Sequence, residues 1–155
     1  MSLVYARGGE IKEGDKLINF VLQNGLTKKS VDFDNDIKGK SKYTAIIFAN
    51  TACSACRREM QTLSALSAKY EDLTTYVILV DMRGADIVEA YDEQFKLNVT
   101  YLLDPEFTQP PIYNFDFTPS LLIVDHSGKI VFKKGGYNTG KDEELLTLKV
   151  WELVK

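Results

Sequence analysis

The sequence predicts one α/β domain with a central mixed β-sheet and helices on both of its faces. Short apolar runs of strand-forming residues alternate with stretches in which apolar residues recur every three to four positions. A hairpin and a final helix follow this alternation. Strands joined through helices lie parallel, whereas a hairpin adds an antiparallel strand, so this order predicts a mixed sheet. With 155 residues the chain is large enough for one such domain and a proper core.

The first part of the chain is predicted to lead into a buried strand. Residues 17–23 alternate between apolar and polar side chains, which indicates a first strand, and Val31 and Phe33 indicate a short partner strand. The polar stretch 34–42 is expected to be a loop. Residues 44–49 are apolar on both faces and rich in strand formers, which is typical of a central strand.

Helices and strands then alternate in the middle of the chain. A helix is expected over residues 53–70, because apolar side chains recur there along one face. Residues 76–81 form a second apolar run and predict a second buried strand. A further helix is expected around residues 87–95, and a short strand over 99–103 ends at an Asp-Pro pair.

The last part of the chain predicts a hairpin and a closing helix. Prolines at 110 and 111 break the chain, and a short helical turn is expected after them. Residues 120–124 and 129–133 flank a Ser-Gly turn and predict the hairpin. The helix over 142–154 has acidic residues in its first turn. Trp151 is expected to pack on the domain. The apolar content of this helix is Leu145, Leu146, Leu148, Val150, Trp151 and Val154.

Composition and charge favour a globular protein without a nucleic-acid partner. Hydrophobic residues make up 45% of the chain, charged residues 26%, and the net charge is -3. The densest basic cluster, Lys38, Lys40 and Lys42, is expected to be a solvated loop. No apolar run approaches the ~20 residues of a transmembrane helix. The first residues do not resemble a signal peptide, which leaves the compartment open because a leader can have been removed.

Two cysteines carry the clearest chemical signal, in the run Cys53-Ser54-Ala55-Cys56 between a predicted strand and a predicted helix. A C-x-x-C pair in β-α-β patterning indicates a redox motif. A helix N-terminus favours a thiolate, which is the attacking species in disulfide exchange. We therefore expect an exposed Cys53 to act as the nucleophile. Cys56 continues the apolar stripe of the helix, so we expect it to be shielded and to resolve the mixed disulfide.

Two other uses of the cysteine pair are less favoured. A zinc site needs four ligands, and only His126, expected in the hairpin turn, remains beside the cysteines. A purely structural disulfide would close a very short loop and add little stability.

Further motifs extend the argument to a family. With Thr118-Pro119 before a predicted strand, the chain resembles thioredoxin-fold proteins. More narrowly, it resembles the TlpA/ResA-like thiol-disulfide oxidoreductases, relatives of the AhpC/TSA peroxiredoxins. The resemblance spans the chain from about Gly14 and includes these motifs: Gly14-Asp15-Lys16, Gly39-Lys40 and Asp125-x-x-Gly128-x-Ile130. It implies a thioredoxin-like fold with an N-terminal β extension and a central α/β insertion between residues 81 and 119. Residues 1–155 would form one domain, with 1–13 peripheral or flexible.

The resemblance also implies a substrate-binding segment. Pro119 would be cis, which would bring the backbone of Thr118 beside Cys53, where an extended substrate chain can pair with it. Ala52 stands where the family usually has tryptophan. The aromatic residues Tyr113, Phe115 and Phe117 occupy alternate positions, so in an extended segment they lie on one face. These residues could form an apolar substrate wall beside the disulfide, but a role in the core is favoured.

The acid-base partner of the cysteines is expected to differ from that of thioredoxins. Ile47 lies where thioredoxins hold a buried aspartate. Glu59 matches an acidic position common in the group and lies three residues after Cys56, on the same helix face. We hypothesise that Glu59 manages the proton of Cys56; the alternative is an exposed helix glutamate.

These observations predict a thiol-disulfide oxidoreductase that acts on protein substrates, as a reductant. The redox-active disulfide would carry the reaction, without a separate cofactor or metal ion. An upstream thiol would donate electrons, and the protein would be a monomer. The resemblance implies an extracytoplasmic location, periplasmic or membrane-anchored, while a cytoplasmic location stays open.

Two alternatives belong to other classes. A peroxiredoxin-like thiol peroxidase would have proline and threonine or serine seven and three residues before its cysteine, where this chain has Ile46 and Asn50. Thr51 is offset by one position. A redox-inactive binding module would keep the fold without using the cysteines.

Overall fold

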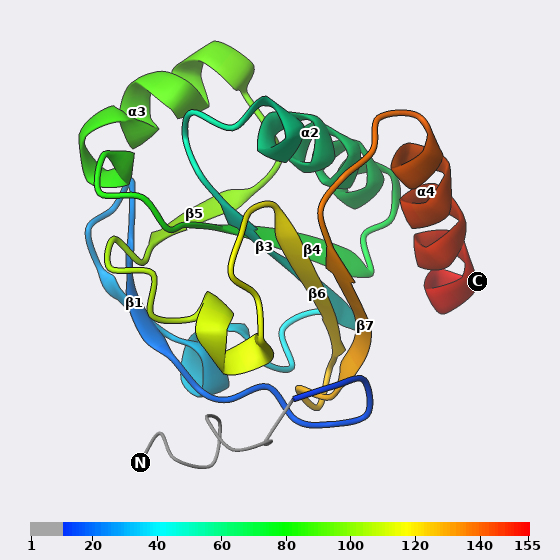
Figure 1. Ribbon diagram of the computed structural model, residues 1–155. Coiled ribbons are helices and arrows are strands. Elements are labelled where there is room, and N and C mark those ends of the chain that lie inside the picture. The colour runs from blue at the N-terminus through cyan, green and yellow to red at the C-terminus, as the bar shows by residue number, and fades with distance from the viewer. Residues whose placement is uncertain (1–10) are drawn as a thin grey trace.

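The computed structural model describes residues 11–155 (Figure 1). Seven strands form one sheet: β1 (Val21–Asn24), β2 (Ser30–Asp32), β3 (Tyr43–Ala49), β4 (Leu73–Leu79), β5 (Thr100–Leu103), β6 (Ser120–Asp125) and β7 (Ile130–Gly135). The helices are α2 (Ser54–Lys69), α3 (Gly84–Phe95) and α4 (Lys141–Val154), with the short helices η1 (Phe33–Ile37) and η2 (Pro110–Tyr113).

The sheet is mixed, with the order β2-β1-β5-β4-β3-β6-β7. β3 is parallel to β4, and β4 is parallel to β5, because α2 and α3 provide the crossovers that parallel neighbours require. β6 and β7 form a hairpin that joins the other side of β3 in antiparallel orientation. β1 and β2 extend the opposite edge as an antiparallel pair.

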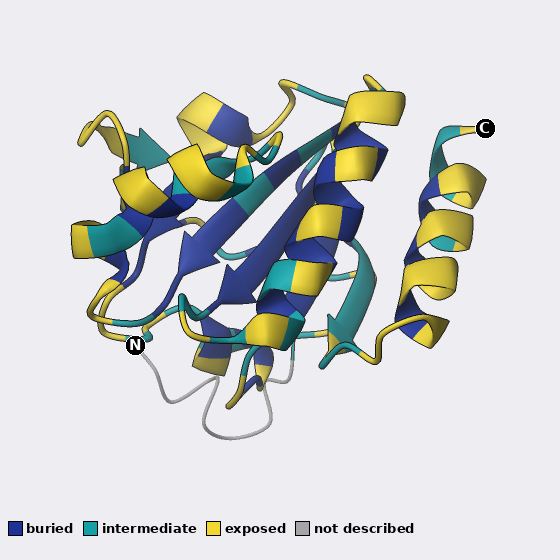
Figure 2. Cartoon of the chain, turned by 90° about the horizontal axis from the view of Figure 1, so that it is seen from above, coloured by how far each residue is buried: buried dark blue, intermediate teal, exposed yellow. Residues whose placement is uncertain are grey.

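The two faces of the sheet are covered differently. Alternate residues of β3 enter separate clusters: Ala45 and Ile47 pack with α2, α3 and α4, whereas Ile46 and Phe48 pack with η1 and η2. Figure 2 shows the buried sides of the long helices turned toward the strands. Helices therefore lie on both faces, as the sequence predicts, but the three long helices share one face and only short helices cover the other.

The region predicted as a loop over residues 34–42 contains η1, so this part of the prediction is wrong. Asp32 caps η1 by accepting a hydrogen bond from the backbone N–H of Asp34. Phe33 and Ile37, four residues apart, are both buried in the core. Their spacing was the available signal, although polar residues separate them.

Two strand boundaries also differ from the prediction. The first strand begins at Val21, because the chain before it is held elsewhere: the N–H of Leu17 donates to the carbonyl of Gly128. β4 begins earlier, at Leu73, because parallel pairing with β3 starts at the Tyr43–Leu73 pair.

The last helix buries only part of its apolar content. Leu146 and Val150 are buried in the core, whereas Leu145, Leu148 and Trp151 are exposed. One side of α4 packs beside α2, so the remaining apolar residues face outward. The expectation that Trp151 packs into the domain is therefore wrong.

The N-terminal segment is joined to β7 where the structure describes it. The Nζ atom of Lys133 donates to the carbonyl of Ile11, and its backbone N–H donates to Glu13. The prediction that residues 1–13 are peripheral or flexible falls mainly on residues 1–10, which lie outside the described residues.

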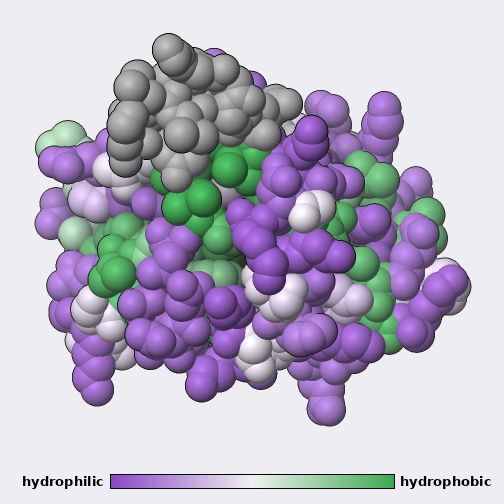
Figure 3. Space-filling view, turned by 90° about the horizontal axis from the view of Figure 1, so that it is seen from below, coloured by the Kyte–Doolittle hydropathy of each residue, from purple (hydrophilic) through white to green (hydrophobic). Residues whose placement is uncertain are grey.

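Figure 3 shows the lower end of the molecule, where hydrophilic side chains cover most of the surface. Among residues 11–155 no helix is both long and apolar enough to cross a membrane.

Candidate active site

The cysteine pair lies where the central strand β3 leads into α2 (Figure 1). Cys53 is the N-cap residue of α2, and its Sγ accepts a hydrogen bond from the backbone N–H of Cys56 at 3.1 Å. A disulfide joins the two residues. In the turn before them, the side chain of Asn50 accepts from the N–H of Ala52 at 2.8 Å, and its carbonyl accepts from the N–H of Cys53. The backbone geometry thus fixes Cys53 at the helix end.

The two sulfur-bearing residues differ in their exposure. Cys53 is partly exposed, whereas Cys56 is fully buried and packs in the cluster that contains Met60 and Leu63. A reagent arriving from solvent therefore meets Cys53 first. The positive end of the α2 dipole favours negative charge on the sulfur at the N-cap.

An aspartate after β4 supports the turn that precedes Cys53. The hydroxyl of Thr51 donates to Asp81 at 2.6 Å, and the N–H of Thr51 donates to the same carboxylate at 3.2 Å. These bonds tie the turn to the end of the neighbouring strand. Asp81 was not among the predicted site residues; its position as the one charged residue at the end of the apolar run 76–81 was the signal that could have indicated a role.

The segment at residues 117–119 approaches the same end of the sheet. The Thr118–Pro119 peptide bond is cis. In the β3–β6 register Ser120 lies opposite Phe48, so the chain before Ser120 continues alongside the end of β3 that leads to Cys53. The carbonyl of Pro119 accepts from Gly136, and within the described residues the backbone of Thr118 makes no backbone hydrogen bond.

The three aromatic residues before Pro119 do not share one environment. Tyr113 and Phe115 are buried in the core, in agreement with the expected packing role. Phe117 is 50% exposed, so for this residue the expectation of core packing is wrong. Its ring lies over Gly135, where an added Cβ would come within 2.9 Å of it. Phe117 is therefore an aromatic surface next to the cis proline.

Glu59 is completely buried, which excludes the alternative of an exposed helix glutamate. Its Oε2 accepts from Lys134 Nζ at 3.2 Å, and its Oε1 has no hydrogen-bond partner among the described residues. Burial raises the pKa of Glu59 from 4.5 to about 7; Lys134 opposes this rise and Asp142 adds to it. Glu59 lies on the same helix face as Cys56, so a group that titrates near neutral pH lies behind the buried sulfur.

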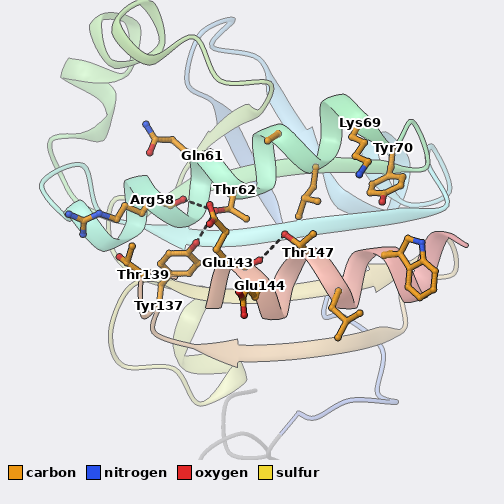
Figure 4. Close-up of a pocket in the computed structure, with 14 residues that line it drawn as sticks. Arg58, Gln61, Thr62, Lys69, Tyr70, Tyr137, Thr139, Glu143, Glu144 and Thr147 are labelled. Atoms are coloured by element: carbon orange, nitrogen blue, oxygen red, sulfur yellow. Dashed lines mark hydrogen bonds between the residues drawn. The ribbon is translucent and has the colours of Figure 1, made fainter. Parts of the chain in front are cut away.

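A groove of about 640 Å³ runs between α2 and α4 (Figure 4). The hydroxyls of Thr62 and Tyr137 meet at its wall, 2.8 Å apart, and Trp151 contributes to its lining. Leu148 and Trp151, two of the exposed apolar residues of α4, line this groove.

No cluster of side chains in residues 11–155 is arranged to hold a metal ion. His126 is exposed in the turn between β6 and β7, whereas Pro119 precedes the opposite end of β6. His126 therefore cannot join the cysteines in a metal site.

A C-x-x-C disulfide at the N-terminus of a helix that follows a central strand, on this sheet, defines a thioredoxin-fold thiol-disulfide oxidoreductase. Comparison with known proteins specifies the family. The model of the AhpC/TSA family matches residues 14–133, and the chain belongs to that family.

Curated relatives and solved structures agree with this class. Thiol-disulfide oxidoreductase ResA of Halalkalibacterium halodurans is 23% identical over 145 residues, which cover 93% of this chain and 78% of the relative. The ResA protein of one Bacillus cereus strain is 26% identical over 141 residues, covering 90% of this chain and 79% of the relative. A putative thiol:disulfide interchange protein DsbE from Chlorobium tepidum has a TM-score of 0.81 at 20% identity, covering 94% of this chain and 99% of that one. The predicted fold and the predicted oxidoreductase class are confirmed.

Proposed function

We propose that the protein reduces disulfides of protein substrates, with Cys53 as the nucleophile and Cys56 as the resolving residue. The observation that carries the proposal is the asymmetry of the pair, because Cys53 is partly exposed at the N-cap and Cys56 is buried. The Cys53 thiolate attacks one substrate sulfur, forms a mixed disulfide and releases the other substrate sulfur as a thiolate. Cys56 then attacks the Sγ of Cys53, which closes the Cys53–Cys56 disulfide and releases the remaining substrate thiolate.

Glu59 takes the proton of Cys56 in the second step. An attacking thiol must lose its proton, and a buried sulfur has no direct access to water for this purpose. Glu59 gains and loses a proton near neutral pH, which suits an acceptor at that pH. Two electrons pass from the cysteine pair to the substrate disulfide in the complete reaction. The substrate leaves as two thiolates, which take protons from solvent, and the proton of Cys56 stays on Glu59.

The substrate chain binds beside Cys53, at Thr118, Pro119, Phe117 and Ala52. The backbone of Thr118 is available for pairing with an extended chain. The exposed ring of Phe117 offers an apolar contact at the same end of the sheet. Ala52 is exposed and small, so a substrate can approach the sulfur of Cys53 closely.

A reductant requires an upstream thiol donor that reopens the Cys53–Cys56 disulfide. We assign the protein to an extracytoplasmic compartment, where such a donor is needed because the surroundings oxidise thiols. A disulfide oxidoreductase from Mycobacterium tuberculosis described as secreted shares the fold at 18% identity, which supports this assignment. A membrane-impermeant thiol reagent applied to intact cells tests it: the reduced, partly exposed Cys53 must react without lysis.

The thiol peroxidase remains the second candidate, because the family that matches the chain is AhpC/TSA. Against it, the hydroxyl of Thr51 donates to Asp81, and Ile46 and Asn50 occupy the positions that a peroxidase needs. Rates of insulin reduction and of peroxide consumption, measured with one thiol donor, separate the two functions. Insulin reduction that is lost in Cys53→Ser supports our proposal, and peroxide consumption without insulin reduction would overturn it.

A redox-inactive binding module makes the opposite prediction for the same variant. It would retain full affinity for its partner and full cellular effect in Cys53→Ser, whereas an oxidoreductase loses its effect with the nucleophile.

A further inference from the structure

One largely covered cation is shared by two buried carboxylates on the helix that carries Cys56 and on the last helix. The side chain of Lys134, on β7, is only 10% exposed. Its Nζ lies 3.2 Å from Glu59 of α2 and 3.4 Å from Asp142 of α4, and it also donates to the carbonyl of Gly136. The ring of Tyr137 lies on another side, with 5.2 Å from Nζ to the ring centroid. Lys134 therefore links a helix that carries the buried cysteine to the last strand and the last helix.

Asp142 holds its place independently of Lys134. It is buried, and its carboxylate accepts a hydrogen bond from the N–H of Asn138 at 2.6 Å, across the loop that leads into α4. The N–H of Asp142 donates in turn to the carbonyl of Asn138. Because this carboxylate is fixed by backbone groups, it competes with Glu59 for the same ammonium group and limits how strongly Lys134 stabilises the charge on Glu59.

The groups around Glu59 can be named from each element that packs on it. They are Cys56 on its own helix, Lys134 from β7, Asp142 from α4, and Tyr137 from the loop between them. Lys134 is thus the one cation in contact with Glu59 among the described residues, and Asp142 is the anion that shares it.

We propose that Lys134 is a positioning residue for the resolving step, and that Asp142, by sharing Lys134, sets the pH at which Glu59 exchanges a proton with Cys56. This inference rests on the proposed function. When the mixed disulfide is resolved, the Glu59 carboxylate accepts the Cys56 proton as the Cys56–Cys53 bond forms and the bond from Cys53 to the substrate sulfur breaks. Glu59 returns the proton when an upstream thiol reopens the disulfide.

The two partners of Glu59 act in opposite directions. Lys134→Met removes the cation and leaves a buried carboxylate beside Asp142, so Glu59 holds its proton to higher pH. Asp142→Asn removes a negative charge and leaves Lys134 to Glu59 alone, so Glu59 loses its proton at lower pH. A charged side chain within a few ångströms of a carboxyl group shifts the pH midpoint of its titration by about one to two units.

Stopped-flow mixing of the reduced protein with a chromogenic aromatic disulfide measures the step directly. The first phase reports attack by Cys53 and the second reports resolution by Cys56, each releasing one coloured thiolate. We expect the pH midpoint of the second phase to rise in Lys134→Met and to fall in Asp142→Asn. Lys133→Met is the matched control, because Lys133 precedes Lys134 on β7 but contacts Ile11 and Phe115 on the other side of the strand; its midpoint stays at the wild-type value.

Midpoints that do not move, or that move in the same direction in both variants, overturn the inference. If Glu59, Lys134 and Asp142 only stabilised the fold, both variants would have a lower free energy of unfolding. The pH midpoints of their second phases would then not move apart. If Lys134→Met does not fold, as judged by circular dichroism, Asp142→Asn alone decides the outcome by its downward shift. Failure of the proposed function looks different: the first phase would then persist in Cys53→Ser, or be absent from the wild type.

Discussion

Replacing Glu59 by glutamine should remove a large pH-dependent contribution to stability. The carboxyl has a pKa of about 7 in the folded protein, against 4.5 for the ordinary group, mainly because burial disfavours its charged form. Between these two values the folded protein binds a proton that the unfolded chain has already lost. The free energy of unfolding of the wild type therefore falls as the pH rises through this window, and it stays lowered above pH 7.

The expected magnitude follows from the size of the shift. Each unit of pKa shift corresponds to ~1.4 kcal/mol, so the whole window corresponds to about 3 kcal/mol. Glutamine does not titrate, so Glu59→Gln lacks this contribution. Its stability relative to the wild type should rise by about 3 kcal/mol between roughly pH 4 and pH 8. Loss of the ion pair with Lys134 shifts the free energy of unfolding of Glu59→Gln at every pH. The informative quantity is therefore how the difference in this free energy between the variant and the wild type changes with pH.

Urea unfolding of the oxidised proteins at a series of pH values measures this difference. The carboxylates outside the Glu59–Lys134–Asp142 cluster have the same surroundings in both proteins and cancel in the comparison. Glu144→Gln, at an exposed position of α4, is the control and should show little change with pH. A difference between wild type and Glu59→Gln that is constant across the window would refute the reasoning, because Glu59 would then ionise in the folded protein as it does in water.

Two other substitutions test the supports of the site. Asp81→Ala removes both hydrogen bonds to Thr51, so it should lower the free energy of unfolding by about 2 to 3 kcal/mol and slow the attack by Cys53. Asp125→Ala is the control, because it also removes several hydrogen bonds, but at the hairpin turn. It should leave the rate of attack unchanged. Gly135→Ala should displace the Phe117 ring and lower kcat/KM several-fold for a protein disulfide, while a small-molecule disulfide reacts at the wild-type rate. Equal losses on both substrates would contradict a substrate-contacting role of Phe117.

The sequence predicted the elements whose pattern is local. The apolar run at 44–49 and the stripe from Cys56 through Met60 identified the buried strand and the helix that carry the cysteines, because burial on both faces or on one face leaves a periodic trace. η1 escaped the prediction because only Phe33 and Ile37 are buried in an otherwise polar segment.

Features that depend on tertiary contact had no such trace. Glu59 and Lys134 are 75 positions apart, and nothing local to either residue indicates that they meet. Trp151 and Leu148 continue the apolar content of α4, but whether they are buried depends on how much of α4 the rest of the domain covers. Periodicity shows which side chains can form a core and does not show where the partner surface ends.

Trapping the mixed disulfide tests the central claim most directly. The reduced Cys56→Ser variant, mixed with a peptide disulfide, should accumulate a covalent adduct whose mass and peptide map place the peptide on Cys53, since the resolving sulfur is gone. The matched Cys53→Ser variant should form no adduct, because Cys56 is buried. An adduct on Cys56 in Cys53→Ser that forms as fast as the adduct on Cys53, or no adduct in Cys56→Ser, would contradict the account.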